Sequence, residues 1–324
     1  MTDPHSGQQV LRAELGTCLV TGGAGFIGSH LAAALQQAGA SVRLLDDLSA
    51  GSLDRVPASL RDSVLVGSLL DDAVLARAVE GVDTVFHLAA LTSVPESWDH
   101  PAHCEEINGL GTARLLERSL AAGVRRLVYA ASSSCYASAA TPRAESDALD
   151  PVSPYAVSKL AGEGHLLAHA RAGRIEGVSL RLFNVYGPGQ RADSPYSGVI
   201  SRFVHQVGSG QTPTVHGDGG QTRDFVHAAD VVAAFLCAAR ASAQVSGQAF
   251  NIGTGLPTSI AELLALIAEL QGRPVDPLRE PARPGEVRHS CAVVTKARVE
   301  LGWEARRSLR AGLASLLGAS ASSC

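Results

Sequence analysis

The sequence predicts an α/β fold built on a doubly wound parallel sheet, and three observations point to it. The 324-residue chain is 46% hydrophobic and 18% charged, so it can bury a large core. Short apolar runs alternate with Ala- and Leu-rich stretches of helical spacing through the first half, which is the βαβ pattern. A glycine-rich turn joins the first apolar run to the first helical stretch, at the place where such sheets bind ligands.

The strands and helices of this sheet follow one another in order. Apolar runs at residues 17–21, 41–46, 63–66, 84–88, 126–131 and 178–182 are expected to be strands, and many are continuous, as in strands buried on both faces. Helices are expected at residues 27–38, 72–79, 111–122 and 156–170, where apolar residues recur at helical period.

A smaller second region is expected after Asn184, where Gly, Pro and Ser punctuate the chain and Tyr186 opens a loop-like stretch. Its helices should lie at residues 199–207, 230–241 and 259–271, with short strands near Thr214 and Ala249. We divide the chain into a flexible leader at residues 1–15, a sheet domain at 16–185 and a smaller α/β substrate domain at 186–324, some segments of which return to the sheet domain.

Composition and charge exclude several kinds of partner. The formal net charge of −4 leaves no broad basic face for nucleic acid or for an anionic membrane. Residues 1–16 lack the features of a signal peptide, and no apolar run reaches the length of a membrane span, so a cytoplasmic location is expected. The six cysteines form no C-x-x-C pair, which predicts reduced thiols and no metal site.

The turn TGGAGFIG, residues 21–28, follows the first strand and opens the first helix. Glycines at this place let the backbone turn tightly and approach a pyrophosphate, and the free N–H groups at the start of the helix attract its charge. A glycine-rich turn alone is weak evidence, but its position between strand and helix favours a dinucleotide.

Asp46 and Asp47 end the second strand, where a carboxylate can accept hydrogen bonds from both ribose hydroxyls and repels a 2′-phosphate. NAD is therefore favoured over NADP, and Asp46 is the better placed of the two. An Asp at the end of a strand is also a common turn residue.

Tyr155 and Lys159 stand four residues apart, on one face of the helix that begins near Pro154. An ammonium beside a phenol stabilises the phenolate, so we expect Lys159 to lower the pKa of Tyr155 toward the range of a general base and to hold the nicotinamide ribose. Ser132, Ser133 and Ser134 follow a strand at the same edge of the sheet, and one of these hydroxyls can relay a proton. We interpret Ser133 as a turn residue.

These motifs together resemble the extended short-chain dehydrogenase/reductase family of NAD-dependent sugar epimerases and dehydratases. The resemblance rests on the glycine turn, Asp46, HLAA at 87–90, Asn108, the serine run, Tyr155 with Lys159, and FNVYGP at 183–188. Downstream, GDGGQTRDF at 217–225, NIGTG at 251–255 and RPGE at 283–286 look like the nucleotide-sugar domain of the family. The match covers nearly the whole chain after the leader and is most similar to bacterial epimerases of UDP-glucose and UDP-N-acetylglucosamine.

The resemblance implies a role for each matching residue. Tyr155 matches the general base, Lys159 the ribose-binding lysine, and Ser132, with Ser134 beside it, the hydroxyl that bonds the sugar O4. The residues implied in NAD binding are Gly22, Gly25, Phe26, Ile27, Gly28, Asp46, Asp47, Leu48, Ser49, Gly51, Ser68, Leu69, Leu88, Ala89, Ala90, Thr92, Asn108, Lys159 and Phe183. Those implied in binding the UDP-sugar are Ser132, Tyr155, Asn184, Val199, His216, Arg223, Arg283, Glu286 and Ser290. Ser68 and His216 depart from the usual Asp and aromatic residue at their places.

The reaction implied is NAD-dependent 4-epimerisation of a UDP-hexose through a 4-keto intermediate. The family's dehydratases carry an Asp-Glu pair where this chain has Ser133 and Ser134, which argues against dehydration of the nucleotide sugar. Epimerisation or decarboxylation of UDP-glucuronate stays open, and so, more remotely, does a non-catalytic NAD-binding scaffold. Ser290 is small, which favours room for an N-acetyl group and thus UDP-GlcNAc and UDP-GalNAc beside UDP-glucose and UDP-galactose. The resemblance also implies a homodimer.

Overall fold

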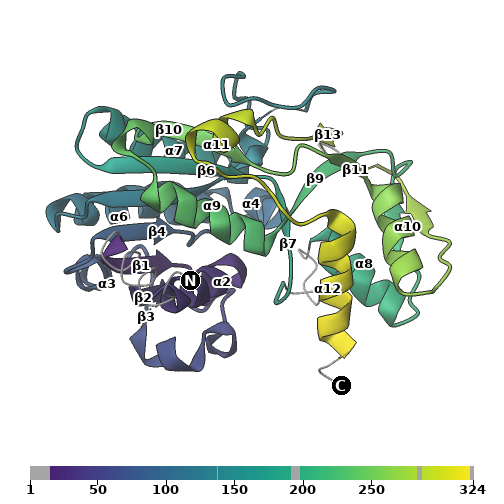
Figure 1. Ribbon diagram of the computed structural model, residues 1–324. Coiled ribbons are helices and arrows are strands. Elements are labelled where there is room, and N and C mark those ends of the chain that lie inside the picture. The colour runs from purple at the N-terminus through teal and green to yellow at the C-terminus, as the bar shows by residue number, and fades with distance from the viewer. Residues whose placement is uncertain (1–14, 137, 191–197, 283–286, 322–324) are drawn as a thin grey trace, which may run out of the picture.

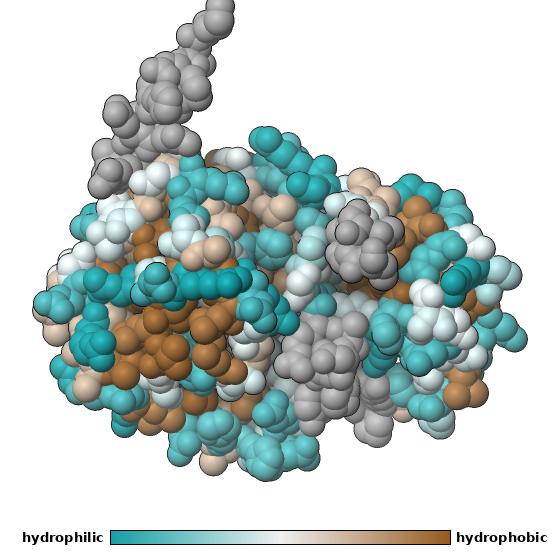
Figure 2. Space-filling model, turned by 90° about the horizontal axis from the view of Figure 1, so that it is seen from below, coloured by the Kyte–Doolittle hydropathy of each residue, from teal (hydrophilic) through white to brown (hydrophobic). Residues whose placement is uncertain are grey.

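The computed structural model describes residues 15–136, 138–190, 198–282 and 287–321. The expected leader therefore lies outside the described residues, except Leu15, which is fully buried. Figure 1 shows two lobes: a large one built around a sheet, and a smaller one that carries the C-terminal helix. On the face shown in Figure 2, hydrophobic side chains gather on the larger lobe, and the smaller lobe is more evenly mixed.

A seven-stranded parallel sheet, in the order β10-β6-β5-β4-β1-β2-β3, forms the large lobe. The chain runs outward from β1 to β3 on one side and continues from β4 on the other, so the switch in strand order lies between β1 and β4. This confirms the predicted doubly wound fold. The strands are β1 (Thr17–Thr21), β2 (Ser41–Asp46), β3 (Val64–Val66), β4 (Thr84–His87), β5 (Arg126–Ser132), β6 (Glu176–Leu182) and β10 (Gln248–Ile252).

Alternate residues of each strand serve the two faces of this sheet. Cys18 and Val20 of β1 belong to the apolar core on one face, and Leu19 between them belongs to the core on the other. Helices α2 (Phe26–Gln37) and α9 (Ala228–Arg240) cover the first face, and α3 (Asp72–Val79), α6 (Gly111–Ala121) and α7 (Pro154–Arg171) cover the second. The four helices predicted in the first half are confirmed to within two residues at each end.

The smaller lobe has its own apolar core, to which Phe203, Leu263 and Leu313 contribute. Its four-stranded sheet contains β7 (Asn184–Tyr186), β9 (Thr222–His227), β11 (Pro257–Ser259) and β13 (His289–Ser290), and β8 (Thr214–His216) pairs with β12 (Leu278–Glu280). The helices are α8 (Val199–Gly208), α10 (Ile260–Leu270) and α12 (Leu309–Ala321), while α11 (Thr295–Glu300) packs on β10 of the large lobe.

Several short elements have no counterpart among the predicted ones. Between β4 and α6 the chain forms α4 (Val94–Asp99), α5 (Pro101–Glu105) and a π-helical turn, η3 (Glu106–Leu110). The 3₁₀ turns are η1 (Leu53–Arg55), η2 (Ala58–Ser63), η4 (Ser133–Cys135) and η5 (Ala243–Val245).

Three predictions about the second half are corrected. The helix predicted at residues 230–241 in the smaller region is α9, which packs on the sheet of the large lobe. Tyr186 does not open a loop but ends β7, where pairing with β9 buries its ring. The strand near Ala249 does not belong to the smaller lobe, because it pairs with β6 at the edge of the large sheet.

Within the described part of the chain, all five cysteines are free and four are buried. In the same residues no group of His, Cys, Asp and Glu is arranged to hold a metal ion. None of the described helices is both long and apolar enough to cross a membrane.

Candidate active site

The loops that follow β1, β4, β5 and β6 all lie at one edge of the sheet, because parallel strands end on the same side. Thr21 is in register with His87, and Ser132 with Leu182. The glycine turn, the segment after His87, the serine run and Phe183 therefore meet at the carboxyl edge, around the switch between β1 and β4.

The glycine turn is shaped so that side chains would obstruct it. Gly22 has a φ of +68°, and a Cβ there would lie 2.8 Å from the Ala89 nitrogen. A Cβ on Gly28 would collide with the Gly22 carbonyl oxygen, so the first turn of α2 packs directly against the loop. Gly25 caps α2 without a side-chain hydrogen bond, which leaves the amides of that turn without a side-chain partner. This cradle fits the pyrophosphate of a dinucleotide.

Asp46 and Asp47 have different environments. The buried Asp46 carboxylate accepts hydrogen bonds from the nitrogens of Ala24 (2.9 Å) and Leu48 (2.8 Å). Burial raises the pKa of Asp46, and the backbone hydrogen bonds act against that rise. A Cβ on Gly51 would lie 2.6 Å from the carboxylate, so this glycine keeps the space beside it free. Asp46 therefore joins the glycine turn to the end of β2.

Asp47 is exposed, and its carboxylate accepts hydrogen bonds from the nitrogen and the hydroxyl of Ser49. It closes a turn in which Leu48 takes a φ of +62°. Ser68 likewise accepts a hydrogen bond from the Leu70 nitrogen at 3.2 Å, and Leu69 is buried. The polar side chains of Asp47, Ser49 and Ser68 are thus engaged in hydrogen bonds that stabilise turns.

A buried chain of hydrogen bonds fixes the end of β4. Thr112 donates to the Asn108 carbonyl oxygen at 2.5 Å and so accepts from His87 Nε2 at 2.9 Å. His87 Nδ1 is then the acceptor for the Thr21 hydroxyl at 2.7 Å. Burial, followed by the charge of Lys159, lowers the pKa of His87 to about 3. His87 is therefore neutral, with its proton on Nε2.

Two side chains hold the backbone of the segment after β4. The Thr21 hydroxyl accepts hydrogen bonds from the nitrogens of Leu88 and Ala89, each at 3.2 Å. The Asn108 amide accepts from the Leu91 nitrogen at 2.8 Å and donates to the Leu91 oxygen and to Ser158 Oγ. The Asn108 amide is thus engaged with the protein, and its contact with NAD stays a prediction. Ala90 and Thr92 lie in the segment that it holds.

Ser132, Ser134 and Tyr155 come together between the end of β5 and the first turn of α7. Ser153 caps the N-terminus of α7 by accepting a hydrogen bond from the Ala156 nitrogen at 3.1 Å. Tyr155 therefore lies in the first turn of this helix. Ser134 Oγ donates to Ser132 Oγ at 2.8 Å, and Ser132 is hydrogen-bonded to the Tyr155 side chain. Three hydroxyl groups thus form one connected set.

Lys159 lies one turn after Tyr155 and is almost fully buried, with Nζ 4.3 Å from the centroid of the Tyr129 ring. Burial lowers the pKa of Lys159 to about 7. Burial also raises the pKa of Tyr155, and the Ser132 hydrogen bond works against that rise. The net shift of the Tyr155 pKa is thus upward, opposite to the expected direction, because removing the phenol from water outweighs the Ser132 hydrogen bond.

The residues implied in sugar-nucleotide binding lie around the junction of the lobes. Phe183 stacks on Tyr136 with ring centroids 6.5 Å apart, and Ser290 of β13 is in register with Arg223 of β9. Arg223 donates to the Thr222 oxygen at 2.9 Å. Asn184 begins β7, Val199 begins α8, and His216, at the end of β8, lies 3.4 Å from Glu280. Arg283 and Glu286 lie outside the described residues.

Sequence reasoning missed two supporting groups. Asp224 is fully buried, and its carboxylate accepts from the nitrogens of Thr254, Gly255 and Ala292, which ties β9 to two other segments. The position of Asp224 next to Arg223 was the only sign of this role in the sequence. Tyr129 beneath Lys159 gave none, because an aromatic residue inside a buried strand is ordinary core.

Comparisons with known proteins agree with this geometry. The family model "NAD dependent epimerase/dehydratase family" matches residues 18–253. A UDP-glucose 4-epimerase of Mycolicibacterium smegmatis is 38% identical over 310 residues, 91% of this chain and 96% of the relative. The structure of a UDP-glucose 4-epimerase with UDP-glucose from Thermotoga maritima is 34% identical with a TM-score of 0.90, covering 95% of this chain and 99% of that one. MoeE5, solved in complex with UDP-glucuronic acid and NAD, is 40% identical with a TM-score of 0.86, covering 95% of this chain and 100% of that one.

Proposed function

Because the chain belongs to the NAD-dependent epimerase/dehydratase family, we propose that it catalyses NAD-dependent inversion at C4 of a UDP-hexose. The observation that carries this proposal is the connected set of Ser134, Ser132 and Tyr155 hydroxyls beside buried Lys159, at the edge of the sheet that also holds the glycine cradle. Ser133 and Ser134 supply no carboxylate for dehydration, which supports epimerisation.

The site residues divide the reaction between them. Tyr155, as the phenolate, takes the proton of the 4-hydroxyl, and Ser132, hydrogen-bonded to the same oxygen, can relay that proton from O4 to Tyr155. When held by the glycine cradle, Asp46 and Lys159, NAD would supply the acceptor for the C4 hydride and the donor that returns it to the opposite face of the 4-keto sugar. Tyr155 then gives the proton back to O4, so protein and cofactor finish as they began. The nucleotide part of the substrate must therefore stay bound while the 4-keto sugar rotates in the site.

The residues of the large lobe fit NAD. The glycine cradle and the first turn of α2 suit its pyrophosphate, and buried Asp46 suits its adenosine ribose. Lys159 suits the second ribose, and the backbone of Ala89 and Ala90, fixed by Thr21 and Asn108, lines the nicotinamide side. A 2′-phosphate beside the Asp46 carboxylate is disfavoured by charge.

For the sugar, we propose that UDP-GlcNAc and UDP-GalNAc are accepted beside UDP-glucose and UDP-galactose. Ser290 is a small residue at the register position of Arg223, one of the arginines assigned to the diphosphate, so it lies close to the nucleotide-sugar position. A small side chain there leaves volume for an acetamido group on C2.

Epimerisation or decarboxylation of a UDP-uronate is the second candidate. MoeE5, which is 40% identical, was solved with UDP-glucuronic acid and also with UDP-glucose, so it supports the uronate as an alternative to the hexose. A uronate adds a carboxylate at C6 and so requires a donor for that group.

We also propose a homodimer formed through α4, η3 and α7, which pack together beside the site. Trp98, Leu110 and Val157 lie on these packed elements with 62%, 44% and 49% of their surface exposed, and apolar side chains grouped on one face mark sites of protein contact. Trp98→Arg should give a monomer by light scattering, whereas Val66→Arg, on the edge strand β3, should not; equal behaviour of the two variants would refute this interface.

The experiment that tests the function is incubation of the purified protein, without added cofactor, with UDP-glucose, UDP-GlcNAc and UDP-glucuronate in parallel. NMR of the products should show axial C4 hydroxyls from the hexoses. A 4-keto-6-deoxy product would mean dehydration, and loss of carbon dioxide from the uronate would support the second candidate instead.

A further inference from the structure

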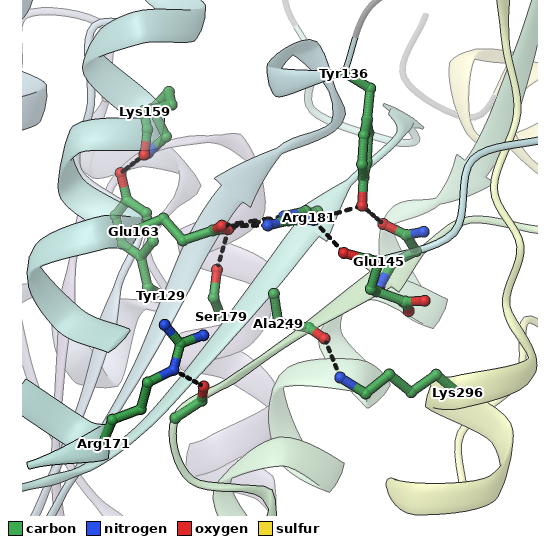
Figure 3. Close-up of polar contacts among 12 residues, drawn as sticks. Tyr129, Tyr136, Glu145, Lys159, Glu163, Arg171, Ser179, Arg181, Ala249 and Lys296 are labelled. Atoms are coloured by element: carbon green, nitrogen blue, oxygen red, sulfur yellow. Dashed lines mark hydrogen bonds and ion pairs between the residues drawn. The ribbon is translucent and has the colours of Figure 1, made fainter. Parts of the chain in front are cut away.

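Tyr129 contacts Lys159 at both ends of the lysine residue. The Tyr129 hydroxyl donates to the Lys159 carbonyl oxygen at 3.3 Å, and the face of the ring lies 4.3 Å from Lys159 Nζ. Tyr129 is completely buried and Lys159 is 3% exposed. Figure 3 shows Tyr129 reaching from β5 to the turn of α7 that carries Lys159. A single side chain thus fixes both the backbone of the lysine and its charged group.

The close approach of α7 to Tyr129 depends on Gly162. A Cβ at this position would lie 2.6 Å from the Tyr129 hydroxyl and 3.0 Å from Thr112 Oγ1. His87 also packs against the Tyr129 ring, with centroids 5.3 Å apart and an angle of 37° between the planes. The ring is therefore closely packed by α7, Thr112 and His87.

Other titratable groups face Lys159 without offering it a free negative charge. Glu163, one turn further along α7, is hydrogen-bonded to Arg181 and Ser179, as Figure 3 shows. The Cys104 thiol on α5 contacts Ser158, and burial raises the pKa of that thiol. Tyr155 precedes Lys159 by one turn, and His87 is neutral. Cys104 and Glu163 act against the lowering of the Lys159 pKa by burial, and the Tyr129 ring adds a negative face 4.3 Å from the ammonium.

We propose that Tyr129 is a positioning residue whose ring face stabilises the ammonium form of Lys159 and aims it into the site. A cation over an aromatic ring within about 6 Å is attracted by the negative face of the ring, more strongly where water is excluded. The catalytic consequence rests on the proposed epimerase function. The contact itself does not, and it is tested without substrate.

The chain contains only two lysines, Lys159 and Lys296, so lysine labelled at Cε and Nζ gives two NMR signals. Lys296→Arg assigns them. Lys296 lies 4.5 Å from the centroid of the Phe250 ring and donates to the Ala249 oxygen, so in every Tyr129 variant it serves as an internal control for folding. The pH titration of both signals is recorded for the wild type, Tyr129→Phe and Tyr129→Leu, with Tyr129→Met as a second variant lacking the ring.

Tyr129→Phe keeps the ring face and should leave the pKa of Lys159 near its wild-type value. Tyr129→Leu and Tyr129→Met should lower it by about one pH unit, the size of a buried cation–ring attraction. The Lys296 titration should not move in any variant. A Lys159 pKa that stays unchanged or rises when the ring is removed, in a variant whose Lys296 signal is native, would overturn the proposal. Because no sugar is present, failure of the epimerase assignment would leave this result unaffected.

Discussion

Tyr155 and Lys159 lie one turn apart on α7, and burial shifts the pKa of the two side chains in opposite directions, upward for the phenol and down to about 7 for the ammonium. The pocket therefore favours the uncharged form of both groups. The Ser132 hydrogen bond acts against the shift of Tyr155. The acid–base role of Tyr155 thus depends on the Ser132 and Ser134 hydroxyls at the end of β5 as much as on its spacing from Lys159.

Removing the phenol should abolish most of the chemistry. Tyr155→Phe is expected to lower kcat about 10²- to 10⁴-fold, the range of general acid–base catalysis, because no other described hydroxyl replaces its proton. Ser132→Ala should lower kcat less and move the acidic limb of the pH profile upward, since the hydrogen bond that opposes the raised pKa of Tyr155 is lost. Ser133→Ala, in the same loop, is the matched control and should retain activity. Steady-state kinetics from pH 6 to 9 would contradict this account if the Ser133 and Ser132 variants behaved alike.

Asp46 should matter for NAD far more than Asp47. Asp46→Ala leaves the buried amides of Ala24 and Leu48 without an acceptor, at a cost of about 1–3 kcal/mol each, and removes the proposed ribose partner. Purified Asp46→Ala should carry at least about tenfold less NAD, equivalent to 1.4 kcal/mol. Asp47→Asn, at the exposed turn, should carry a normal amount. Chromatography of the nucleotide released on denaturation measures both, and equal loss would refute the assignment.

His87 should make the protein sensitive to acid. Its folded pKa of about 3 lies below the unfolded value of about 6.5, so the unfolded state binds more protons between these limits and stability falls as pH drops through that window. The advantage of wild type over His87→Gln in free energy of unfolding should shrink by about 1 to 3 kcal/mol between pH 6.5 and 4.5. Urea denaturation at several pH values checks this. A constant difference would show that His87 is not held in its neutral form.

The buried pair of Glu163 and Arg181 supports the back of the catalytic helix, and Arg181 also donates to Tyr136 at 2.6 Å (Figure 3). Arg181→Met alone leaves the Glu163 carboxylate buried without its partner and should cost about 3–5 kcal/mol of stability. Glu163→Gln with Arg181→Met should recover part of that loss, because neither charge remains. Urea denaturation of the single and double variants tests this, and a double variant less stable than Arg181→Met would argue against a paired charge.

The size of Ser290 should decide the substrate range. Ser290→Tyr is expected to abolish turnover of UDP-GlcNAc and UDP-GalNAc while sparing UDP-glucose and UDP-galactose, since the larger side chain fills the space for the C2 substituent. Ser290→Ala is the matched control and should accept both pairs. Comparison of kcat/KM on the four sugars measures the effect. Equal loss on both pairs after Ser290→Tyr would remove Ser290 from the sugar pocket.

The sequence predicts most of the large lobe well because many of its strands are continuous apolar runs and the helices between them keep their period. β1, β2 and α3 begin and end where their patterns do. The smaller lobe is less predictable, since three-residue strands such as β7 and β11 are defined by their partners in space and carry almost no periodic signal. The strand near Ala249 joins the large sheet for the same reason, because only tertiary pairing assigns it.

The candidate site is likewise predicted in part by sequence motifs and in part decided by tertiary contacts. Motif spacing is enough to select the glycine turn, Asp46, Ser132, Tyr155 and Lys159, which the fold gathers at one edge. Spacing does not reveal whether a polar side chain is free. The amide of Asn108 is engaged with Leu91 and Ser158, and burial reverses the pKa shift expected for Tyr155. Support from Tyr129, His87 and Asp224 depends on contacts between distant segments.

The most direct test of the central claim is the fate of deuterium placed at C4 of UDP-glucose, followed by NMR during turnover in ordinary water. Inversion by removal and return of the same hydride predicts UDP-galactose with deuterium retained at C4. Deuterium at C6 of a 4-keto-6-deoxy sugar, or deuterium lost to water, would contradict the account.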